Sequence, residues 1–451
     1  MKVAVLREIC PGERRVALVP DACSRLIKSG LSVDVQAGAG TEAGYPDPQY
    51  TDTGATIAED VRTLYSQADL IVRAAPPGDH PELHCDEIDL PRSGAVWIGF
   101  LDPLIAFDRV QKLADRGITG VSMELIPRIT RAQGMDALSS MANIAGYKSV
   151  LLAAARLPKM FPMMMTAAGT VSPARVLVIG AGVAGLQAIA TAKRLGALVS
   201  GYDVRPAVKE QVESLGAKFV QMDLQTDAAE DKGGYAKDQG EEFLRKQREL
   251  MSDTVAAHDV VITTAAIPGK KSPVLVTGEM VQRMAPGSVI VDLAAERGGN
   301  CELTRLDEEV TEHGVLILGP GNLPATVPFH ASQMYARNVS TLVLHLVKDG
   351  AVHLDFDDEI TAGCVVTHEG RIIHPRIREL MGLPPLDATQ GQPDKPDQTE
   401  SQHTTPIPNA PPTLSTPPIP DEPPTLSAPP IPDAPSDTSA PAPRADDGSN
   451  N

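Results

Sequence analysis

Short apolar runs alternate with amphipathic segments from the first residues of the chain onward. Five runs rich in Val, Ile, Leu and Ala are predicted strands, at 2–6, 32–37, 69–74, 95–101 and 117–124. The segments between them carry helical spacing, most clearly at 21–29 and 105–116. Strands that alternate with helices in this way predict a parallel sheet covered by helices, which is a doubly wound α/β unit.

A second series of the same kind begins with a long apolar helix near Ala145. Its predicted strands lie at 175–179, 198–203, 218–221, 259–264, 288–293 and 315–318. An apolar helical pattern at 328–347 is expected to return the chain to the first unit, followed by a hairpin at 364–374 that turns at Glu369 and Gly370. We therefore predict a first domain at 1–144, completed by about 328–383, and a second at 145–327. Ligands of such folds bind at the carboxyl ends of the strands, here facing an interdomain cleft.

The segment from Pro384 to the last residue has a different composition. It holds 19 of the 40 prolines, no aromatic residue, ten acidic residues and two basic ones. A twelve-residue repeat runs through 411–422 and 423–434. Such a segment cannot bury enough apolar area to offset its chain entropy, so we predict a disordered tail with polyproline character. A docking role and a dispensable tail both remain open.

One strand of the second series ends in a glycine-rich turn. The strand at 175–179 leads into Gly180, Gly182 and Gly185, and an Ala-rich helix follows. In a dinucleotide-binding turn, these glycines permit the tight turn, the approach of a pyrophosphate and close helix packing. Asp203 ends the next predicted strand about 20 residues on, where a ribose-binding carboxylate belongs. The alternative is an ordinary strand-to-helix turn. The predicted fold is therefore α/β, with two doubly wound Rossmann-like domains joined by crossing helices and a disordered C-terminal tail.

Charge and composition exclude several classes of partner. The net charge of −18 argues against nucleic acid and against an anionic membrane surface. The five cysteines form no C-x-x-C pair and are typical of reduced thiols. The longest apolar region, 150–171, contains two prolines and two basic residues, so we expect no direct membrane span, and the chain opens on a strand rather than on a targeting segment. We therefore expect a cytoplasmic protein.

A polar stretch follows the last predicted strand of the first domain. Arg128, Gln133, Asp136 and Ser139 place a cation, an amide, a carboxylate and a hydroxyl within twelve residues. A Gln side chain offers the donor and the acceptor that a nicotinamide carboxamide needs. An Arg and an Asp close together would stiffen the loop. The alternative is a solvated loop in which Asp136 caps the following helix.

Two further stretches are candidates for ligand contact. Residues 231–238 carry paired glycines before Tyr235, which suits a lid over a bound nucleotide, although an ordinary surface loop fits equally well. Residues 292–302 follow a buried strand, and Asp292 and Glu296 are candidate polar anchors there. The alternative for both carboxylates is pairing with two arginines of the same segment, Arg297 and Arg305.

At these stretches the chain closely resembles a known family over residues 1–383. The set of Arg128, Gln133, Asp136 and Ser139, the run 161–171, the Gly-Gly-Tyr-Ala-Lys arm and the run 292–300 resemble signatures of the NAD(H)-binding component, domain I of the alpha subunit, of proton-translocating NAD(P) transhydrogenase. The resemblance implies that Arg128, Gln133, Asp136 and Ser139 form the hydride-transfer loop and that no metal is needed. The implied NAD(H)-binding residues are Gln133, Gly134, Met135, Asp136, Gly180, Gly182, Val183, Ala184, Gly185, Asp203, Val204, Arg205, Gly234, Tyr235 and Ala266.

The resemblance also implies a reaction and its partners. Hydride would pass between NADH on this chain and NADP+ on a partner, because the chain carries a single glycine fingerprint. The implied partners are the NADP(H)-binding domain of the beta subunit, separate membrane-spanning transhydrogenase subunits and a second copy of the chain. The chain would lie peripherally on the cytoplasmic face of the inner or plasma membrane. Asp203 should select NAD(H) over NADP(H), and Arg205 opposes that preference.

Alanine dehydrogenase is the nearest alternative, because the run 13–20 also resembles that family. Such an enzyme needs a proton-transferring His and a Lys for its keto acid. The predicted strand at 95–101 runs into Asp102, and no histidine lies between His84 and His258, although Arg15 remains a candidate for a carboxylate. The first turn of this domain, at 7–16, has no G-x-G-x-x-G and is not expected to hold a nucleotide by itself. A nucleotide-sensing regulator without chemistry also remains open.

Overall fold

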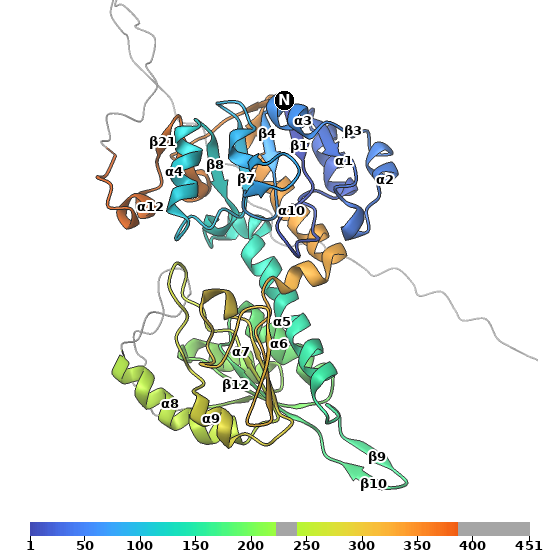
Figure 1. Cartoon of the computed structure of the whole chain (residues 1–451), viewed down its shortest axis with the longest axis vertical. Coiled ribbons are helices and arrows are strands. Elements are labelled where there is room, and N and C mark those ends of the chain that lie inside the picture. Colours follow the sequence, from blue (N-terminus) through green and yellow to red (C-terminus); the bar gives the residue numbers. More distant parts are fainter. Residues whose placement is uncertain (222–240, 387–451) are drawn as a thin grey trace, which may run out of the picture. The chain divides into compact units, whose positions relative to one another are not determined.

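The computed structural model describes residues 1–221 and 241–386 (Figure 1). Two of the candidate ligand contacts, Gly234 and Tyr235, and the predicted disordered tail from residue 387 lie outside the described residues. Among the described helices, none is long and apolar enough to cross a membrane.

The first sheet has eight strands in the order β21-β20-β8-β7-β4-β1-β2-β3. The six strands from β8 to β3 pair in parallel, while β20 and β21 add an antiparallel edge beside β8. The strand bounds are β1 Lys2–Val5, β2 Ser32–Gln36, β3 Thr56–Ala58, β4 Leu70–Val72, β7 Val96–Gly99, β8 Thr119–Ser122, β20 Val365–His368 and β21 Arg371–Ile372.

The predicted strands of this sheet are confirmed, since each of the five apolar runs contains one of β1, β2, β4, β7 and β8. The edge strand β3 was missed because it has three residues, none of them buried. The predicted hairpin is also confirmed, and its first strand pairs with β8. The helices packed with this sheet are α1 Pro20–Lys28, α2 Asp47–Thr51, α3 Val61–Gln67, α4 Phe107–Asp115, α10 Pro328–Leu346, α11 Glu359–Cys364 and α12 Pro375–Leu380.

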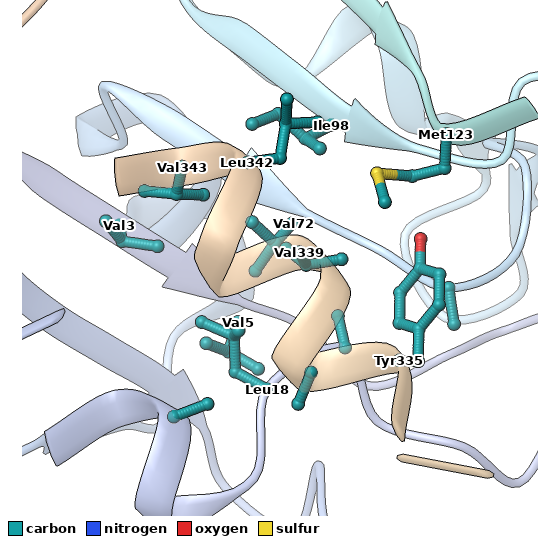
Figure 2. Close-up of a cluster of buried hydrophobic side chains, with 14 of the residues drawn as sticks. Val3, Val5, Leu18, Val72, Ile98, Met123, Tyr335, Val339, Leu342 and Val343 are labelled. Atoms are coloured by element: carbon teal, nitrogen blue, oxygen red, sulfur yellow. The ribbon is translucent and has the colours of Figure 1, made fainter. Parts of the chain in front are cut away.

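Helix α10 supplies part of the core of the first sheet (Figure 2). Val339, Leu342 and Val343 lie in one buried cluster with side chains of three parallel strands, namely Val3, Val5, Val72 and Ile98. Apolar burial of this kind stabilises a domain by about 25 cal/mol per Å² removed from water. A segment that lies more than 300 residues from β1 in the sequence therefore completes the fold of the first sheet.

The second sheet has seven strands in the order β13-β12-β11-β14-β15-β17-β16, all parallel except β16. Its strands are β11 Arg175–Ile179, β12 Leu198–Tyr202, β13 Lys218–Phe219, β14 Val260–Thr263, β15 Val289–Asp292, β16 Glu309–Glu312 and β17 Val315–Leu318. All six predicted strands are confirmed. Strand β16 was missed because it is a polar, largely exposed edge strand.

Helix α5 Ala137–Arg156 joins the two sheets. It begins earlier than predicted because Asp136 caps it, and it packs on both α6 Val183–Arg194 and α10. A Cβ atom on Gly146 of α5 would overlap the carbonyl group of Ala184 in α6, so the two helices cross in close contact. The other helices of the second unit are α7 Lys209–Ser214, α8 Glu241–Ala256 and α9 Gly278–Arg283.

A two-stranded hairpin follows α5 and extends away from the second sheet (Figure 1). Its strands are β9 Met164–Thr166 and β10 Gly169–Val171, and every residue in them is exposed. The remaining short strands are β5 Asp79–His80, β6 Cys85–Asp86, β18 Val347–Lys348 and β19 Ala351–Val352. The α/β fold with two parallel-sheet domains, predicted from the apolar pattern, is thus confirmed.

Candidate functional site

The glycine turn after β11 has the geometry that its residues require. Gly180 has a φ of 93°, a left-handed value that favours glycine. A Cβ atom there would lie 2.7 Å from the hydroxyl oxygen of Thr264, which donates a 2.9 Å hydrogen bond to the Gly180 carbonyl. A Cβ atom on Gly185 would overlap that same carbonyl oxygen, so only glycine lets α6 start this close to the strand.

The middle glycine of the turn has a different environment. Gly182 is the N-cap residue of α6, where no side chain caps the helix. A Cβ atom on Gly182 would meet one described atom within 4 Å, the Nη2 of Arg205 at 3.9 Å. Val183 and Ala184 follow in the first turn of α6 and are partly exposed. The uncapped amides and the helix dipole make this turn suitable for an anion such as a pyrophosphate.

Asp203 lies directly after β12, beside the glycine turn, and is 9% exposed. Its Oδ2 accepts a 2.7 Å hydrogen bond from the Ala181 amide and a 2.9 Å bond from Arg205 Nη2. Its Oδ1 accepts 2.9 Å bonds from the amide and from the Nε of Arg205. Val204, between them, is partly buried. The predicted ribose-binding carboxylate is therefore in place, and in this structure a neighbouring arginine holds it.

Asp292 does not act as a ligand anchor, and it does not pair with an arginine. It is fully buried at the end of β15, and its oxygens accept hydrogen bonds from backbone amides and hydroxyl groups. The donors are Thr263 Oγ1, Thr304 Oγ1 and the amides of Ala294, Asn300 and Cys301. Both interpretations of Asp292 are thus wrong, because five donors enclose the carboxylate, most of them from the following loop. It fixes residues 293–304 instead.

The partners expected for the other charged residues of this segment are also different. Glu296 accepts a 3.0 Å hydrogen bond from the Asn322 amide, Arg297 pairs with Asp102, and Arg305 pairs with Glu308. The pattern of charges in the sequence could not reveal these partners, since two of them lie in distant segments.

Asn300 is a residue that the sequence did not single out. Its side-chain oxygen accepts a 2.9 Å bond from the Ala265 amide, and its side-chain nitrogen donates to the carbonyls of Ala265 and Pro273. It therefore fixes the backbone after β14, where Ala266 is exposed. The only signal available was its place at the end of the conspicuous run 292–300.

The polar loop before α5 exposes the Gln133 amide. Residues Thr130–Met135 form a single 3-10 segment in which Gln133 and Gly134 are exposed and Met135 is buried. Arg128, just before it, is also exposed. The carbonyl of Gly134 accepts a 2.9 Å bond from Asn338 Nδ2 on α10, a positioning contact that no local sequence pattern indicates.

Asp136 and Ser139 lie together at the start of α5. The carboxylate accepts 2.9 Å and 2.6 Å hydrogen bonds from the amide and the hydroxyl group of Ser139. The capping geometry, which was the alternative interpretation of Asp136, is therefore present, and it is compatible with a role in shaping the loop. From this cap to Gly146, ten residues of α5 rise about 15 Å, so one helix fixes the spacing between the polar loop and the glycine turn.

Two contacts connect loops of the first sheet to the second. Asp102 pairs with Arg297, and Asn322 Nδ2 donates a 2.8 Å bond to Glu13. Asp102 has a left-handed φ of 56°, and its amide donates a 2.7 Å bond to Glu124 Oε1. Burial raises the pKa of the Glu124 carboxyl to about 6. These contacts are formed at the carboxyl ends of the strands, which is the edge predicted to bind the ligand.

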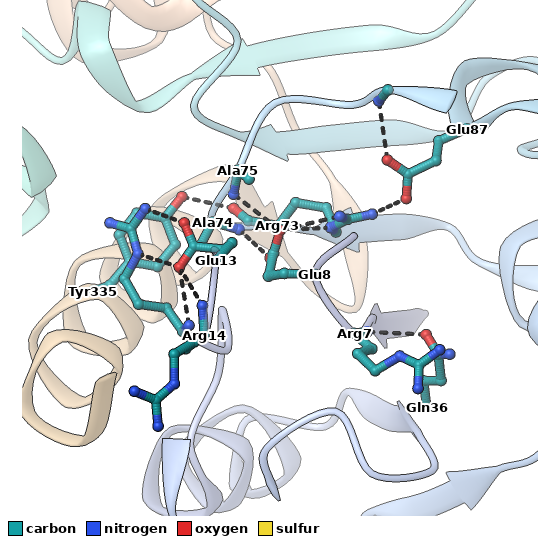
Figure 3. A network of polar contacts seen from close by, with 12 residues as sticks. Arg7, Glu8, Glu13, Arg14, Gln36, Arg73, Ala74, Ala75, Glu87 and Tyr335 are labelled. Atoms are coloured by element: carbon teal, nitrogen blue, oxygen red, sulfur yellow. Dashed lines mark hydrogen bonds and ion pairs between the residues drawn. The ribbon is translucent and has the colours of Figure 1, made fainter. Parts of the chain in front are cut away.

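The first turn of the first sheet is filled by its own charges (Figure 3). The fully buried Arg73 pairs with Glu8 and with Glu87, and Glu8 also accepts hydrogen bonds from the amides of Ala74 and Ala75. No group of acidic, histidine or cysteine side chains that could hold a metal ion occurs among the residues that the structure describes.

Arg15, the candidate for a substrate carboxylate, already binds one. Its Nε and Nη2 donate bonds of 2.8 Å and 2.6 Å to the two oxygens of Glu13, and its side chain is 6% exposed. This bidentate geometry uses the face of the guanidinium that a keto acid would need.

Comparisons with known proteins match nearly the whole of the described chain. Residues 4–145 match the alanine dehydrogenase/PNT N-terminal domain, and residues 149–375 match the alanine dehydrogenase/PNT C-terminal domain. The first of the chains that make up the NAD(P) transhydrogenase alpha subunit of Rhodospirillum rubrum is 49% identical over 380 residues, which cover 84% of this chain and 99% of that protein. The alanine dehydrogenase of Bacillus subtilis is 28% identical over 404 residues, covering 88% and 98%. Among solved structures, the transhydrogenase from Sinorhizobium meliloti is 42% identical and covers 83% of this chain and 99% of that one, with a TM-score of 0.72.

Proposed function

This chain belongs to the alanine dehydrogenase/PNT family, and on that premise we propose that it is the NAD(H)-binding component of a Re/Si-specific, proton-translocating NAD(P) transhydrogenase. The observation that carries the proposal is the relation between two parts of the site. A glycine turn that is open at Gly182 is joined by helix α5 to a loop that exposes the amide of Gln133. A pyrophosphate at the turn and a nicotinamide at the loop would occupy the two ends of one bound dinucleotide.

The reaction is direct hydride transfer to NADP+ on another protein. Two nicotinamides exchange hydride without a protein acid or base, provided that the reacting carbons approach to roughly 3–3.5 Å in a dry site. The chain has one glycine fingerprint, so the NADP(H) would be bound by a beta subunit. Arg128, Gln133, Asp136 and Ser139 would position the nicotinamide rather than transfer a proton.

An alanine dehydrogenase activity is less well supported by the first sheet. The cations nearest to its first turn, Arg15 and Arg73, are buried and bound to carboxylates of the same domain. A keto acid would have to displace Glu13 from Arg15, which would leave a buried carboxylate without its partner.

The partners follow from the same proposal. Separate membrane-spanning subunits would carry the proton, and this chain would lie peripherally on the cytoplasmic side. A homodimer is supported by the exposed hairpin, because Met163, Met165 and Val171 are 58%, 80% and 40% exposed. Such an apolar arm is typical of a protein contact. Sedimentation should give a dimer for the chain and a monomer for Met165→Asp, and a monomeric wild type would contradict this part of the proposal.

Replacing Gln133 with Asn tests the role of the loop. The shorter side chain keeps the amide but moves it by about one bond length, and a misplacement near 1 Å can slow a reaction about 100-fold. NADH affinity should stay within about threefold, since the pyrophosphate and ribose contacts remain. Fluorescence titration measures binding, and stopped-flow oxidation of NADH in the presence of the partner domain measures transfer.

The matched control is Gln111→Asn, which shortens an exposed amide on α4. It should change neither quantity. Equal losses of affinity and rate in Gln133→Asn would contradict a positioning role, and a wild-type chain that does not bind NADH would contradict the proposed function as a whole.

A further inference from the structure

The carboxylate of Asp203 has no acceptor position left for a ribose. An ionised carboxylate offers about four lone-pair sites. Four donors use them: the amide of Ala181 and three nitrogens of Arg205, at distances of 2.7–2.9 Å. The two hydroxyl groups of an adenosine ribose would bring two further donors. A ribose can bind this carboxylate only when the guanidinium gives up its bonds.

Arg205 also covers the approach to Asp203. The side chains of the pair are 13% and 5% exposed, the arginine being the outer partner. Its Nη2 is the described atom nearest to a Cβ built on Gly182, at 3.9 Å. The guanidinium therefore lies between the carboxylate and the glycine turn, along the path of the adenosine half of a dinucleotide.

We propose that Arg205 competes with the adenosine ribose of NAD(H) for Asp203 and thereby sets the selectivity between NAD(H) and NADP(H). The inference rests on the proposed function, because it assumes that the glycine turn binds NADH. In the nucleotide-free protein the carboxylate is held by Arg205. On binding, the 2′- and 3′-hydroxyl groups replace the side-chain nitrogens of Arg205, while the Ala181 amide remains a donor.

A phosphorylated ribose reverses the effect of Arg205. A 2′-phosphate brings acceptor oxygens and negative charge, so the Asp203 carboxylate repels it. A guanidinium is the side chain best suited to bind phosphate, through parallel N–H donors. Arg205 thus weakens the binding of NADH by competition and supports the binding of NADPH by direct contact. It narrows the preference that Asp203 creates.

The test is to measure NADH and NADPH dissociation constants for the full chain and for three variants. Arg205→Leu removes the competitor, so the dissociation constant for NADH should fall by up to about tenfold, the gain expected if the competent state is about one-tenth populated. The constant for NADPH should rise at least about tenfold. Arg205→Lys keeps the charge but loses the fork, so it should tighten NADH with little change for NADPH.

Lys209→Leu is the matched control, because it removes an exposed positive charge four residues away that does not contact Asp203. It should leave the ratio of the two constants unchanged. Thermal unfolding without nucleotide checks that each variant is folded, and Arg205→Lys keeps the site testable if the leucine variant is not.

A second readout separates competition from a general change in charge. Arg205→Leu should bind ADP more tightly than the wild type does, but 2′,3′-dideoxy-ADP should show no gain because it lacks the hydroxyl donors. Weaker NADH binding in Arg205→Leu, an unchanged NADH/NADPH ratio, or an equal gain for the dideoxy nucleotide would each overturn the proposal. A wild type that binds NADPH but not NADH would overturn the proposed function and this inference together, whereas NADH binding with an unchanged ratio overturns the inference alone.

Discussion

The two sheets use the turn after a central strand in opposite ways. In the first sheet, β1 lies between β4 and β2, and the turn that follows it carries Glu8, whose carboxylate binds the buried Arg73. In the second sheet, β11 lies between β14 and β12, and the turn that follows it has glycines at 180, 182 and 185. The topology is similar, yet one turn is closed by charged side chains and the other leaves its backbone open. Fold alone therefore does not decide which sheet holds a nucleotide; the side chains at the turn do.

The closed turn depends on every charge having its partner. Burial raises the pKa of the Glu8 carboxyl above its ordinary value, although the charge of Arg73 opposes this. Tyr65 also donates a hydrogen bond to Glu87, and Arg73 Nη1 donates to Tyr65 at 3.0 Å. Such a network stabilises a domain only while it is complete, because a buried charge without a partner is costly.

Arg73→Met should cause the largest loss in this comparison. It leaves two buried carboxylates without their cation and should lower the free energy of unfolding by about 3–5 kcal/mol. Urea unfolding followed by circular dichroism measures this loss, and NADH binding should persist in the remaining folded protein. The control Arg92→Met breaks an exposed pair with Asp69 and should cost less than about 1 kcal/mol. Equal effects of the two variants would show that the network in the first turn does not stabilise the first sheet.

Gly185→Ala should disturb the open turn next most strongly. The added Cβ would overlap the Gly180 carbonyl, so α6 must shift, at a cost of about 3 kcal/mol. NADH binding should be lost with it, as seen by fluorescence titration. Gly78→Ala is the control, since no atom lies within 4 Å of its Cβ and its φ is not left-handed. A stable Gly185→Ala protein with normal NADH affinity would contradict the close packing of this turn.

Glu124→Gln should remove a pH dependence from the first sheet. The folded pKa of about 6 exceeds the ordinary value of 4.5, so the folded protein binds this proton more tightly and loses stability as the pH rises through that interval. Above pH 6 the cost amounts to about 2 kcal/mol. The stability difference between wild type and Glu124→Gln should therefore change by that amount between about pH 4 and pH 7.5. The exposed Glu82→Gln is the control, and a constant difference for Glu124→Gln would contradict the burial of this carboxyl.

Gly182→Ala should give the smallest effect on the free protein and a selective effect on binding. The free protein has room for the methyl group, so its unfolding free energy should change by less than about 1 kcal/mol. The methyl group would occupy the approach of the pyrophosphate, and NADH affinity should fall about tenfold, or about 1.4 kcal/mol. Calorimetric titration and thermal unfolding measure the two quantities. Unchanged affinity would mean that no phosphate comes close to this backbone.

Much of the fold could be predicted from the sequence because buried parallel strands are continuous apolar runs. The eleven predicted strands and the glycine turn were found in this way. The polar edge strands β3 and β16 were missed, since exposed strands lack that signal. Apolar content indicates a strand but not its neighbours, so the packing of Tyr335 and Val339 in the core of the first sheet required the structure.

The polar partners in the site were less predictable. Asp203 and Arg205 are two residues apart, and the sequence indicated their opposing effects but not that one binds the other. Asp292 was expected to face a ligand and instead organises a loop, while Asn300 and Asn338 were not singled out at all. The direction of a side chain depends on tertiary contacts with distant segments, and a local pattern does not contain them. The roles of Gln133 and its neighbours remain predictions.

The most direct test of the proposed function is a comparison of two mixtures that contain the purified chain and NADH. One mixture adds pyruvate and ammonium, and the other adds the NADP(H)-binding domain of a transhydrogenase beta subunit that carries an NADP+ analogue. We expect oxidation of NADH, followed by absorbance, in the second mixture only. Oxidation in the first mixture, or NADH binding without oxidation in either one, would contradict the proposed hydride transfer between nicotinamides.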